Sequence, residues 1–556
     1  MIICGIKLTH DGAVALIDDQ QLVCCIEMEK LDNAPRYMHF NIEMDRLEQL
    51  LQQYGYSFNS IDRLVLDGWA PEEQITINLG KGNFPIKLAG YGSMVMRENI
   101  LERQCFDMPG FSGLSYASYQ HVAGHIAGAY CTSPFANQQE DAFVLIWDGG
   151  MYPQLFYFHH KTGSVENLGV LFMLIGNIYS IFSQHFGPYK VKEGVVNDQL
   201  SVAGKVMAYI ALGELKPELL PVFRSIYDAP GQKNMQFANS FSKAFLQQVQ
   251  GRNYRDEDIL HTFHVFLEQL LVEKLTAKIK RYPGRQPNLC FAGGCALNIK
   301  WNSAIRNTGL FKEVWVPPFP NDSGSALGTA CCEMISAGTN YALDWNVYSG
   351  PAAINNGTDA KWIAQETTVQ ELAQLLFEKN EPVVFLNGAA ELGPRALGNR
   401  SILAPATDAA MKGVLNKIKS RESYRPVAPI CLEEDAPDIF EPGIRDPYML
   451  FDHKVRPAWK DRIPAVCHLD GTARLQTVNS TDNPVIYELL MAYKQLSGIP
   501  LLCNTSANLN GRGFFPDAAS AMAWNEVNYV WCNNRLYEKT EKHSFQLLSP
   551  TYNTSI

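Results

Sequence analysis

The chain opens with short apolar runs separated by turn residues, a pattern that predicts strands joined by tight turns. Residues 2–8, 13–18 and 22–28 each have the length and apolar content of a strand, and His10-Asp11-Gly12 supplies the turn between the first two. We therefore expect a strand, turn, strand, strand unit at the start of the chain.

The same order returns further along the chain, which predicts two related halves that face each other. Residues 143–147 predict a strand, Asp148-Gly149-Gly150 its turn, and 155–160 the returning strand. A third glycine turn, within 292–298, follows the strand-like residues 288–291. Glycine lets a phosphate or nucleoside approach backbone N–H groups closely, although an ordinary hairpin or loop explains each turn taken singly.

Apolar content also marks the later elements. The most apolar run, 168–182, is shorter than the roughly 20 residues that a membrane span needs and contains Asn177, so it predicts a buried helix. Residues 337–359 are rich in Gly, Asn, Ala and Tyr and predict a connection. Beyond them, residues 382–388 and 500–506 predict strands.

Basic residues gather around these last strands, although the chain as a whole is acidic. Arginine forks and lysine point charges suit phosphate and carboxylate groups. A set of surface salt bridges is the alternative. The cations concerned are Arg395, Arg400, Lys419, Arg425 and Arg474.

Two histidines four residues apart, His121 and His125, would lie on one face of a helix and form half of a metal site. Gly124 and Gly128 would let that helix approach another backbone, and Asp322 precedes a probable helix. A carboxylate and two imidazoles leave positions open on a metal. Surface or satisfied core histidines are the alternative reading. A metallopeptidase is disfavoured, because Val122 replaces the Glu of a His-Glu-x-x-His motif.

Composition narrows the class of protein. A length of 556 residues predicts two to four domains, and a net charge of -10 argues against nucleic acid as the partner. The thirteen cysteines are odd in number and lack a Cys-x-x-Cys pair, so they predict reduced thiols in the cytoplasm. No signal peptide or membrane anchor is predicted, a small-molecule partner is, and an oligomer is compatible with the sequence.

Taken together, the motifs resemble the O-carbamoyltransferases, which include nodulation-factor enzymes and the antibiotic-tailoring enzymes of the tobramycin, cephamycin and ansamycin pathways. Residues 29–36 and 504–511 depart from the nodulation pattern and point to the antibiotic-tailoring branch, nearest to the tobramycin type. The motifs that carry the resemblance are 5–15, the histidine pair, 204–207, 293–298, 393–400, 421–426 and 502–506.

The resemblance implies an α/β fold with two domains and a tail. Residues 1–350 would form a duplicated ribonuclease-H-type domain of the actin/Hsp70 kind, similar to the tRNA threonylcarbamoyltransferases. Residues 351–515 would form an α/β domain similar to threonylcarbamoyl-adenylate synthase. Residues 516–556 would join that domain or return to pack on the first.

The implied reaction uses ATP, carbamoyl phosphate and a divalent metal. Carbamoyl phosphate and ATP would give carbamoyl-adenylate at the C-terminal domain. The carbamoyl group would then move to a hydroxyl of a small natural-product acceptor at the N-terminal domain. Adenylation is needed because free carbamate is a poor electrophile, and an enclosed passage would protect the mixed anhydride from water.

In the N-terminal domain the resemblance makes His121, His125 and Asp322 ligands of iron, manganese or magnesium. His10 would be the general base, since an imidazole titrating near neutrality can accept the hydroxyl proton. A turn histidine that shapes the acceptor pocket is its alternative. Lys205 would neutralise developing charge, or is a solvated helix lysine. The implied nucleotide and phosphate contacts are Asp148, Gly149, Gly293, Gly294 and Asn298.

In the C-terminal domain Lys419, Arg425 and Arg474 would bind carbamoyl phosphate and the nucleotide phosphates. Arg395 and Arg400 are second choices, with a structural ion pair to Glu391 or Glu422 as the alternative for one of them. Asn504 would hold the carbamoyl amide. Cys503 beside it is a weaker candidate nucleophile, because a buried cysteine also packs as a small hydrophobe.

Other classes stay open. The three glycine turns alone fit an ATP-dependent small-molecule kinase, which would not need the C-terminal cations. A tRNA threonylcarbamoyl-type modification protein would need a basic stripe, and a carbamoyl-nucleotide sensor would bind without turnover. Dependence on carbamoyl phosphate separates all of these from the carbamoyltransferase.

Overall fold

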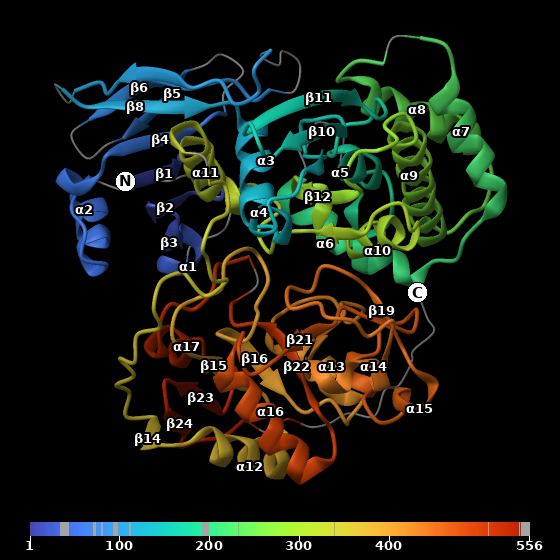
Figure 1. The fold of residues 1–556 in the computed structure, drawn as a ribbon. Helices are drawn as coiled ribbons and strands as arrows, with labels where there is room; N and C mark the ends of the chain where they lie inside the picture. Colours follow the sequence, from blue (N-terminus) through green and yellow to red (C-terminus); the bar gives the residue numbers. More distant parts are fainter. Residues whose placement is uncertain are drawn as a thin grey trace. The chain divides into compact units, whose positions relative to one another are not determined.

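The computed structural model describes residues 1–33, 44–69, 74–78, 82–92, 98–110, 113–191, 199–231, 233–338, 340–509, 511–543 and 545. The chain forms two compact units (Figure 1). Unit 1 comprises Met1–Cys25 and Tyr37–Asn346, and unit 2 comprises Ile26–Arg36 and Val347–Ile556.

The first sheet of unit 1 has six strands in the order β3-β2-β1-β4-β8-β7. β1 runs antiparallel to β2 and parallel to β4, and β4 runs parallel to β8. The strands are β1 (Ile2–Lys7), β2 (Ala13–Asp18), β3 (Gln21–Glu27), β4 (Arg63–Asp67), β7 (Gln104–Asp107) and β8 (Ser115–Tyr119).

The second sheet repeats this plan with five strands in the order β11-β10-β9-β12-β13. β9 runs antiparallel to β10 and parallel to β12, and β12 runs parallel to β13. The two sheets thus share strand order and direction, as the repeated strand and turn pattern predicts. The strands are β9 (Ala142–Ile146), β10 (Gln154–His159), β11 (Ser164–Val170), β12 (Asn288–Ala292) and β13 (Glu313–Trp315).

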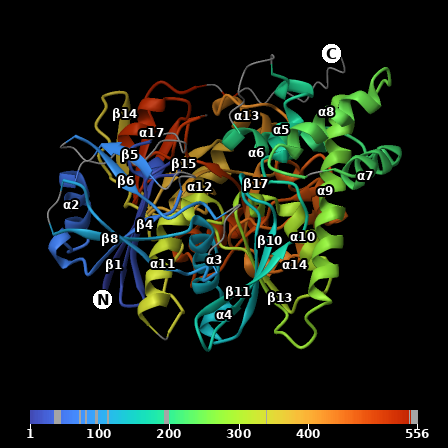
Figure 2. The ribbon, with the colours of Figure 1, turned by 90° about the horizontal axis from the view of Figure 1, so that it is seen from above.

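Two helices pack between these sheets, α3 (His121–Cys131) and α11 (Ser325–Ala337), and they lie side by side in Figures 1 and 2. Glycine makes their contact possible, because a Cβ on Gly328 would lie 2.2 Å from the carbonyl oxygen of Gly124. Gly5 of β1 likewise admits the backbone of α11, at Ala326 O. The small residues therefore set how closely the first residues of both helices approach.

The apolar run 168–182 is not one buried helix as expected. Its first residues end β11, which pairs with β10, and only Ile178–Ser183 forms a helix, α5. An apolar run of this length does not distinguish a strand from a helix. The helices that follow form a phenylalanine-rich core, in which Phe182 stacks on Phe263 with ring centroids 3.9 Å apart.

The other helices and strands of unit 1 are α2 (Met44–Gln53), β5 (Gln74–Asn78), β6 (Asn83–Lys87), α4 (Pro134–Asn137), α6 (Gln199–Tyr209), α7 (Leu220–Asp228), α8 (Phe237–Val249), α9 (Asp256–Ile279) and α10 (Ile299–Asn307).

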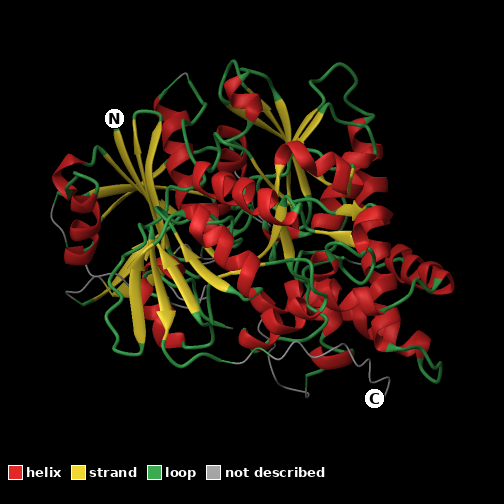
Figure 3. Ribbon diagram, turned by 90° about the horizontal axis from the view of Figure 1, so that it is seen from below, coloured by secondary structure: helices red, strands yellow, loops and turns green. Residues whose placement is uncertain are grey.

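Unit 2 is built on an eight-stranded mixed sheet in the order β14-β24-β23-β15-β16-β22-β17-β21. Helix α12 (Val369–Lys379) begins at a capping box formed by Thr368 and Glu371, and it packs against α16 (Pro484–Ser497). Figure 3 shows helices beside strands in this mixed α/β architecture.

The division of the chain differs from the three expected segments. The segment from Ile26 belongs to unit 2, although it lies within the range 1–350. Residues 516–556, left open as a tail that could return to the first domain, contribute β23 (Tyr529–Cys532) and β24 (Arg535–Lys539) to unit 2. The physical reason is strand pairing, because β23 runs parallel to β15 and β24 antiparallel to β14.

The remaining elements of unit 2 are α1 (Met28–Leu31), β14 (Trp362–Glu366), β15 (Val383–Leu386), β16 (Arg400–Ala404), α13 (Ala410–Ile418), β17 (Ala428–Leu432), α14 (Ala436–Ile439), β18 (Phe440–Glu441), β19 (His453–Val455), α15 (Pro457–Lys460), β20 (Thr472–Ala473), β21 (Gln476–Val478), β22 (Leu501–Ser506) and α17 (Ala518–Trp524). Among the described residues, no helix combines the length and the apolar character needed to cross a membrane.

Candidate functional site

The carboxyl ends of the parallel strands in the first sheet bring three polar side chains together. Lys7 ends β1, Asp67 ends β4, and His121 follows β8 at the first position of α3. Asp67 Oδ2 lies 3.0 Å from Lys7 Nζ and 2.8 Å from His121 Nδ1. The carboxyl ends of neighbouring parallel strands lie at one edge of a sheet, and this edge carries the first three side chains of the site.

The second half supplies the facing side chains in the same manner. Asp148 follows β9, Gly293 and Gly294 follow β12, and Asp322 precedes α11. Gly293 needs glycine, because its φ is 89° and a Cβ would lie 2.5 Å from the carbonyl oxygen of Trp147. The glycine turn therefore packs directly against the turn that carries Asp148.

Four of these side chains form a potential metal-binding group. One ligand atom from each of His121, His125, Asp148 and Asp322 lies within 4.8 Å of the others, and all four side chains are buried. Asp322 Oδ1 is 3.4 Å from His121 Nε2 and 3.6 Å from His125 Nε2. Both Nε2 atoms are buried without a hydrogen-bond partner in the described part of the chain. Two orphaned imidazole nitrogens facing one carboxylate oxygen fit a divalent metal.

Asp67 fixes the orientation of His121. Its carboxylate accepts a hydrogen bond from Nδ1–H, so Nε2 is the ring nitrogen that faces Asp322. Burial, the largest single influence, lowers the pKa of His121, but the carboxylates of Asp67 and Asp322 together raise it to about 9.

Lys7 is a fully buried ammonium within this carboxylate cluster. Its Nζ lies 3.1 Å from Asp322 Oδ2 and 4.2 Å from the centre of the Trp69 ring. Burial lowers the pKa of Lys7, whereas Asp322 and Asp67 raise it above its ordinary value. Burial raises the pKa of Asp322, but Lys7 and His121 hold it well below its usual range.

Asp148 is held by both halves of unit 1. Its Oδ1 accepts a hydrogen bond from the backbone N–H of Gly294 at 2.7 Å, and Tyr91 donates its hydroxyl to Oδ2. The Tyr91 ring also stacks on His121 with centroids 4.8 Å apart. Burial and Asp148 raise the pKa of Tyr91, so the hydroxyl stays a donor.

His10 lies beside this group at the tip of the first turn, as the sequence predicts. Its Nδ1 is 3.1 Å from Asp11 Oδ2, and its Nε2 is 3.5 Å from Asp322 Oδ2. The imidazole keeps 18% of its surface exposed and contacts the edge of the Trp69 ring. Asp11 Oδ2 accepts a hydrogen bond from Nδ1–H, so Nε2 is the ring nitrogen that faces Asp322.

The other residues predicted in unit 1 have different settings. Gly149 borders Asn177, whose Oδ1 would lie 2.9 Å from an added Cβ. Asn298 caps α10, and its Oδ1 accepts hydrogen bonds from the backbone N–H groups of Lys300 and Trp301. Lys205 is half-buried on α6, and no contact in the described residues joins it to the histidines.

A cluster of cations lies in unit 2, and one of its members escaped the sequence analysis. Lys419 and Arg474 were predicted. Arg421 lies among them, where burial, Arg425 and Arg474 lower its pKa to about 9. Burial and Arg425 likewise lower the pKa of Arg474 to about 10. Buried atoms of two guanidinium groups, Arg421 Nη2 and Arg474 Nε, have no hydrogen-bond partner in the described residues.

β22 separates its residues between two environments. Asn504 and Ser506 share one face, where Lys419 donates a hydrogen bond to Ser506 Oγ at 2.9 Å and Asn504 Nδ2 donates to Gln476 Oε1 at 2.8 Å. Asn504 Oδ1 is buried without a partner in the described residues. Cys503 points to the opposite face and packs in the hydrophobic core, where burial raises the pKa of its thiol.

The two arginines of 393–400 also differ from each other. Arg400 is buried, and its guanidinium donates to the carbonyl oxygens of Asn387 and Gly388, so it ties backbone segments together. Arg395 is half-buried in the connection between β15 and β16.

Four residues of these sites were missed, namely Lys7, Asp67, Tyr91 and Arg421. A lysine inside an apolar strand was a signal for Lys7. The signal for Asp67 was an apolar strand followed directly by Asp67-Gly68, the same order of strand and Asp-Gly turn as in the other turns. Arg421 lies two residues from Lys419 within a motif already recognised. Tyr91 carries no signal in the sequence that we can identify.

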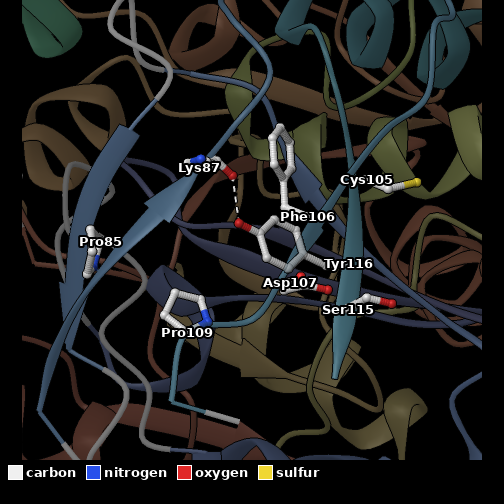
Figure 4. A pocket seen from close by; sticks show the side chains of 8 residues that line it. All are labelled: Pro85, Lys87, Cys105, Phe106, Asp107, Pro109, Ser115 and Tyr116. Carbon is white, nitrogen blue, oxygen red and sulfur yellow. Dashed lines mark hydrogen bonds between the residues drawn. The ribbon is translucent and has the colours of Figure 1, made fainter. Parts of the chain in front are cut away.

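A separate surface pocket of about 400 Å³ lies between β6, β7 and β8 (Figure 4). Its wall includes Lys87, Cys105, Asp107 and Tyr116, and the Tyr116 hydroxyl donates to the carbonyl oxygen of Lys87 at 2.8 Å. None of the predicted site residues lines it.

Comparisons with known proteins match nearly the whole chain. Residues 2–331 match the family model described as Carbamoyltransferase N-terminus, and residues 373–539 match the one described as Carbamoyltransferase C-terminus.

Curated relatives cover the same length. The chain is 48% identical to Nodulation protein U of Rhizobium tropici, over 97% of this chain and 96% of that protein. It is 31% identical to 3'-hydroxymethylcephem-O-carbamoyltransferase of Streptomyces clavuligerus, over 97% of this chain and 99% of that protein. Identity is thus higher to the nodulation protein, although two motif departures pointed to the antibiotic-tailoring branch.

Solved structures are similar at lower identity. A ROK family protein from Streptococcus pneumoniae in complex with sucrose shares 11% identity, covering 61% of this chain and 99% of that one, with a TM-score of 0.25. Acetate kinase from Entamoeba histolytica shares 10% identity, covering 60% and 99%, with a TM-score of 0.25.

Proposed function

Because the chain belongs to the carbamoyltransferase family, and is therefore a carbamoyltransferase of the O-carbamoyltransferase kind, we propose that it works through carbamoyl-adenylate. Carbamoyl phosphate and ATP are the proposed substrates at unit 2. A hydroxyl of a small natural-product molecule is the proposed acceptor at unit 1. The higher identity to nodulation proteins favours an acceptor like theirs over a cephem.

The cation cluster supports the first half-reaction. Water cleaves carbamoyl phosphate to carbamate and phosphate, and a carbamate oxygen then attacks the α-phosphorus of ATP and displaces pyrophosphate. Both steps involve several negative charges, and the guanidinium groups of Arg421, Arg425 and Arg474 would offer them preorganised positive charge. Lys419 Nζ is hydrogen-bonded to Ser506 and Asn508, so it would support this site from the side of β22. Asn504 Oδ1, buried without a hydrogen-bond partner in the described residues, would accept a hydrogen bond from the carbamoyl NH₂ group.

The residues of unit 1 support the second half-reaction. The acceptor oxygen would attack the carbamoyl carbon, and its proton would pass to His10 Nε2. The bond between that carbon and the bridging phosphate oxygen would then break, and AMP would leave with the oxygen and the electron pair. A divalent metal held by His121, His125 and Asp322 would supply Lewis-acid polarisation of a carbonyl or phosphate oxygen. Asp148 and the Gly293-Gly294 turn would border the nucleotide phosphate, since glycine lets a ligand approach the backbone closely.

The proposal rests on one observation: His10 Nε2 lies 3.5 Å from Asp322 Oδ2. The other oxygen of Asp322, Oδ1, faces the Nε2 atoms of His121 and His125, which have no hydrogen-bond partner in the described residues. A base and a metal-ligand set in one enclosed place suit acyl transfer to a hydroxyl. The shared strand order of the two sheets supports an actin/Hsp70-type duplicated domain. For unit 2, the cations support the role of an adenylate-forming domain.

The test separates the two half-reactions. Pyrophosphate release from ATP is measured with and without carbamoyl phosphate, and with no acceptor present. We expect release that depends on carbamoyl phosphate, is abolished in Arg474→Ala and persists in His10→Ala. Arg462→Ala, at an exposed arginine stacked on Trp459, is the matched control. Absence of release, or release of ADP, would overturn the adenylate mechanism and favour a kinase.

A further inference from the structure

The two oxygens of Asp322 have different partners. Oδ1 faces the two imidazole nitrogens of the metal group, at 3.4 and 3.6 Å. Oδ2 lies 3.1 Å from Lys7 Nζ and 3.5 Å from His10 Nε2. The carboxylate is therefore shared between a metal site on one side and an ammonium on the other.

Lys7 is held firmly in this position. Its side chain is 1% exposed, and Asp67 and Trp69 bind its ammonium from other directions, at 3.0 and 4.2 Å. Asp67 is in turn fixed by its hydrogen bond with His121. At this burial Lys7 cannot touch an acceptor or nucleotide, so any effect on the reaction passes through Asp322.

We propose that Lys7 is a positioning residue that keeps Asp322 a one-oxygen metal ligand. The ammonium lies 3.1 Å from Oδ2 as an ion pair, without a hydrogen bond to it in the described residues, so its charge repels a cation from that oxygen. Oδ1 is the oxygen that faces His121 and His125. A one-oxygen carboxylate leaves more positions open for oxygens of substrates than a two-oxygen carboxylate does. Lys7 thereby lowers the affinity for the metal and keeps coordination positions open to oxygens of substrates. This inference rests on the metal site of the proposed function.

Removal of the ammonium should strengthen metal binding for two reasons. Asp322 becomes free to offer both oxygens, and a fixed positive charge near the dication disappears. Both changes strengthen metal binding. A purely structural lysine would behave in the opposite way, because its loss would loosen Asp67 and Asp322 and weaken binding.

The experiment titrates the metal-free protein with Co²⁺ and no substrate, and records the d–d absorption of the bound ion. In Lys7→Met we expect affinity to rise about tenfold or more, the d–d bands to weaken as coordination increases, and inorganic phosphate to perturb the bands less than in the unmodified protein. Lys30→Met is the control, because Lys30 is equally buried and paired with Glu27 in unit 2. Its Co²⁺ affinity should stay unchanged.

Weaker or unchanged Co²⁺ binding in Lys7→Met, with an unchanged spectrum, would overturn the proposal. Failure of the unmodified protein to bind Co²⁺ would overturn the metal site as well, which separates the two failures. If Lys7→Met does not fold, Lys7→Gln takes its place, and the rise in melting temperature caused by Co²⁺ reports the same affinity. The expected rise exceeds that of the unmodified protein, and a smaller rise contradicts the inference.

Discussion

Asp67 Oδ2 accepts a hydrogen bond from His121 Nδ1 at 2.8 Å, so a residue at the end of β4 decides which nitrogen of that imidazole faces the metal group. In Asp67→Asn we expect metal affinity to fall about ten- to a hundredfold, because the carboxylate no longer strengthens the imidazole as a ligand. Calorimetric titration with Mn²⁺ measures the change. Asp19→Asn is the control, since that carboxylate is 83% exposed. Equal affinity in both variants would contradict the role of Asp67.

Gly328 sets the distance between α3 and α11. In Gly328→Ala the new Cβ meets the carbonyl oxygen of Gly124 at 2.2 Å, so the helices must separate. We expect a loss of about 1–3 kcal/mol in stability, as for overpacking elsewhere, together with weaker metal binding. Thermal melting and metal titration measure both effects.

The control for this change is Gly204→Ala on α6, where no atom lies within 4 Å of the added Cβ. It should be neutral or slightly stabilising, because alanine favours helix. A Gly328→Ala protein that melts and binds metal like the control would show that the helix contact tolerates a methyl group.

The cations of unit 2 should destabilise the ligand-free protein. Burial and neighbouring cations lower the pKa of Arg421 to about 9, so charging it costs free energy at neutral pH, and this cost begins to shrink only as the pH rises above that value. Arg474 is one of the cations that impose this cost on Arg421. Arg474→Gln should therefore raise the melting temperature, by about 2–4 °C for each kcal/mol relieved. It should also remove the stabilisation that pyrophosphate gives.

The control for charge alone is Arg462→Gln, because Arg462 is exposed. It should leave the response to pyrophosphate unchanged. A lower melting temperature in Arg474→Gln, with the pyrophosphate response retained, would mean that Arg474 stabilises the fold and binds no anion.

His264 should make unit 1 sensitive to acid. It is buried beside Tyr179 and Trp301, and burial, with Lys300 nearby, lowers its pKa to about 3. Its neutral form is thus required by the fold. Stability is unaffected above the unfolded pKa of about 6.5 and falls as the pH drops towards 3, by up to roughly 1.4 kcal/mol per pH unit.

In His264→Phe, which keeps an aromatic ring against Trp301, the melting temperature should fall less between pH 7 and pH 5 than in the unmodified protein. His159→Gln, at a partly exposed position, serves as the control. The carboxylate of Glu268 lies 4.0 Å from His264 Nε2 and offsets part of the effect. Parallel pH profiles for the two proteins would contradict this origin of acid sensitivity.

The local parts of the site could be predicted from sequence, because they depend on helix and strand periods. His121 and His125 share a helix face by their four-residue spacing, and the neighbouring glycines do admit a second helix. The two-residue alternation of a strand could also have separated Cys503 from Asn504 in the sequence analysis, but it was not applied there. Adjacent strand residues point to opposite faces, so only one of them could lie with Lys419.

The remaining parts depend on contacts between distant segments. Lys7 and Asp67 meet because β1 and β4 are parallel neighbours, and no spacing in the sequence states that register. Asp322 was considered because it precedes a probable helix, but only the resemblance to a family joined it to the histidines, which are far from it along the chain. The run 168–182 was assigned to the wrong element because its apolar residues suit a strand end and a helix equally.

The segment that begins at Ile26 has a practical consequence for dissecting the protein. The chain leaves unit 1 after Cys25, returns to it, and leaves again after Asn346, so no single cut separates the units. A fragment that starts at Val347 would lack Glu27 and Lys30, to which Gly393 N–H and the carbonyl oxygen of Gly393 are hydrogen-bonded. Supplying that short peptide separately should restore to the fragment the partners that it lost.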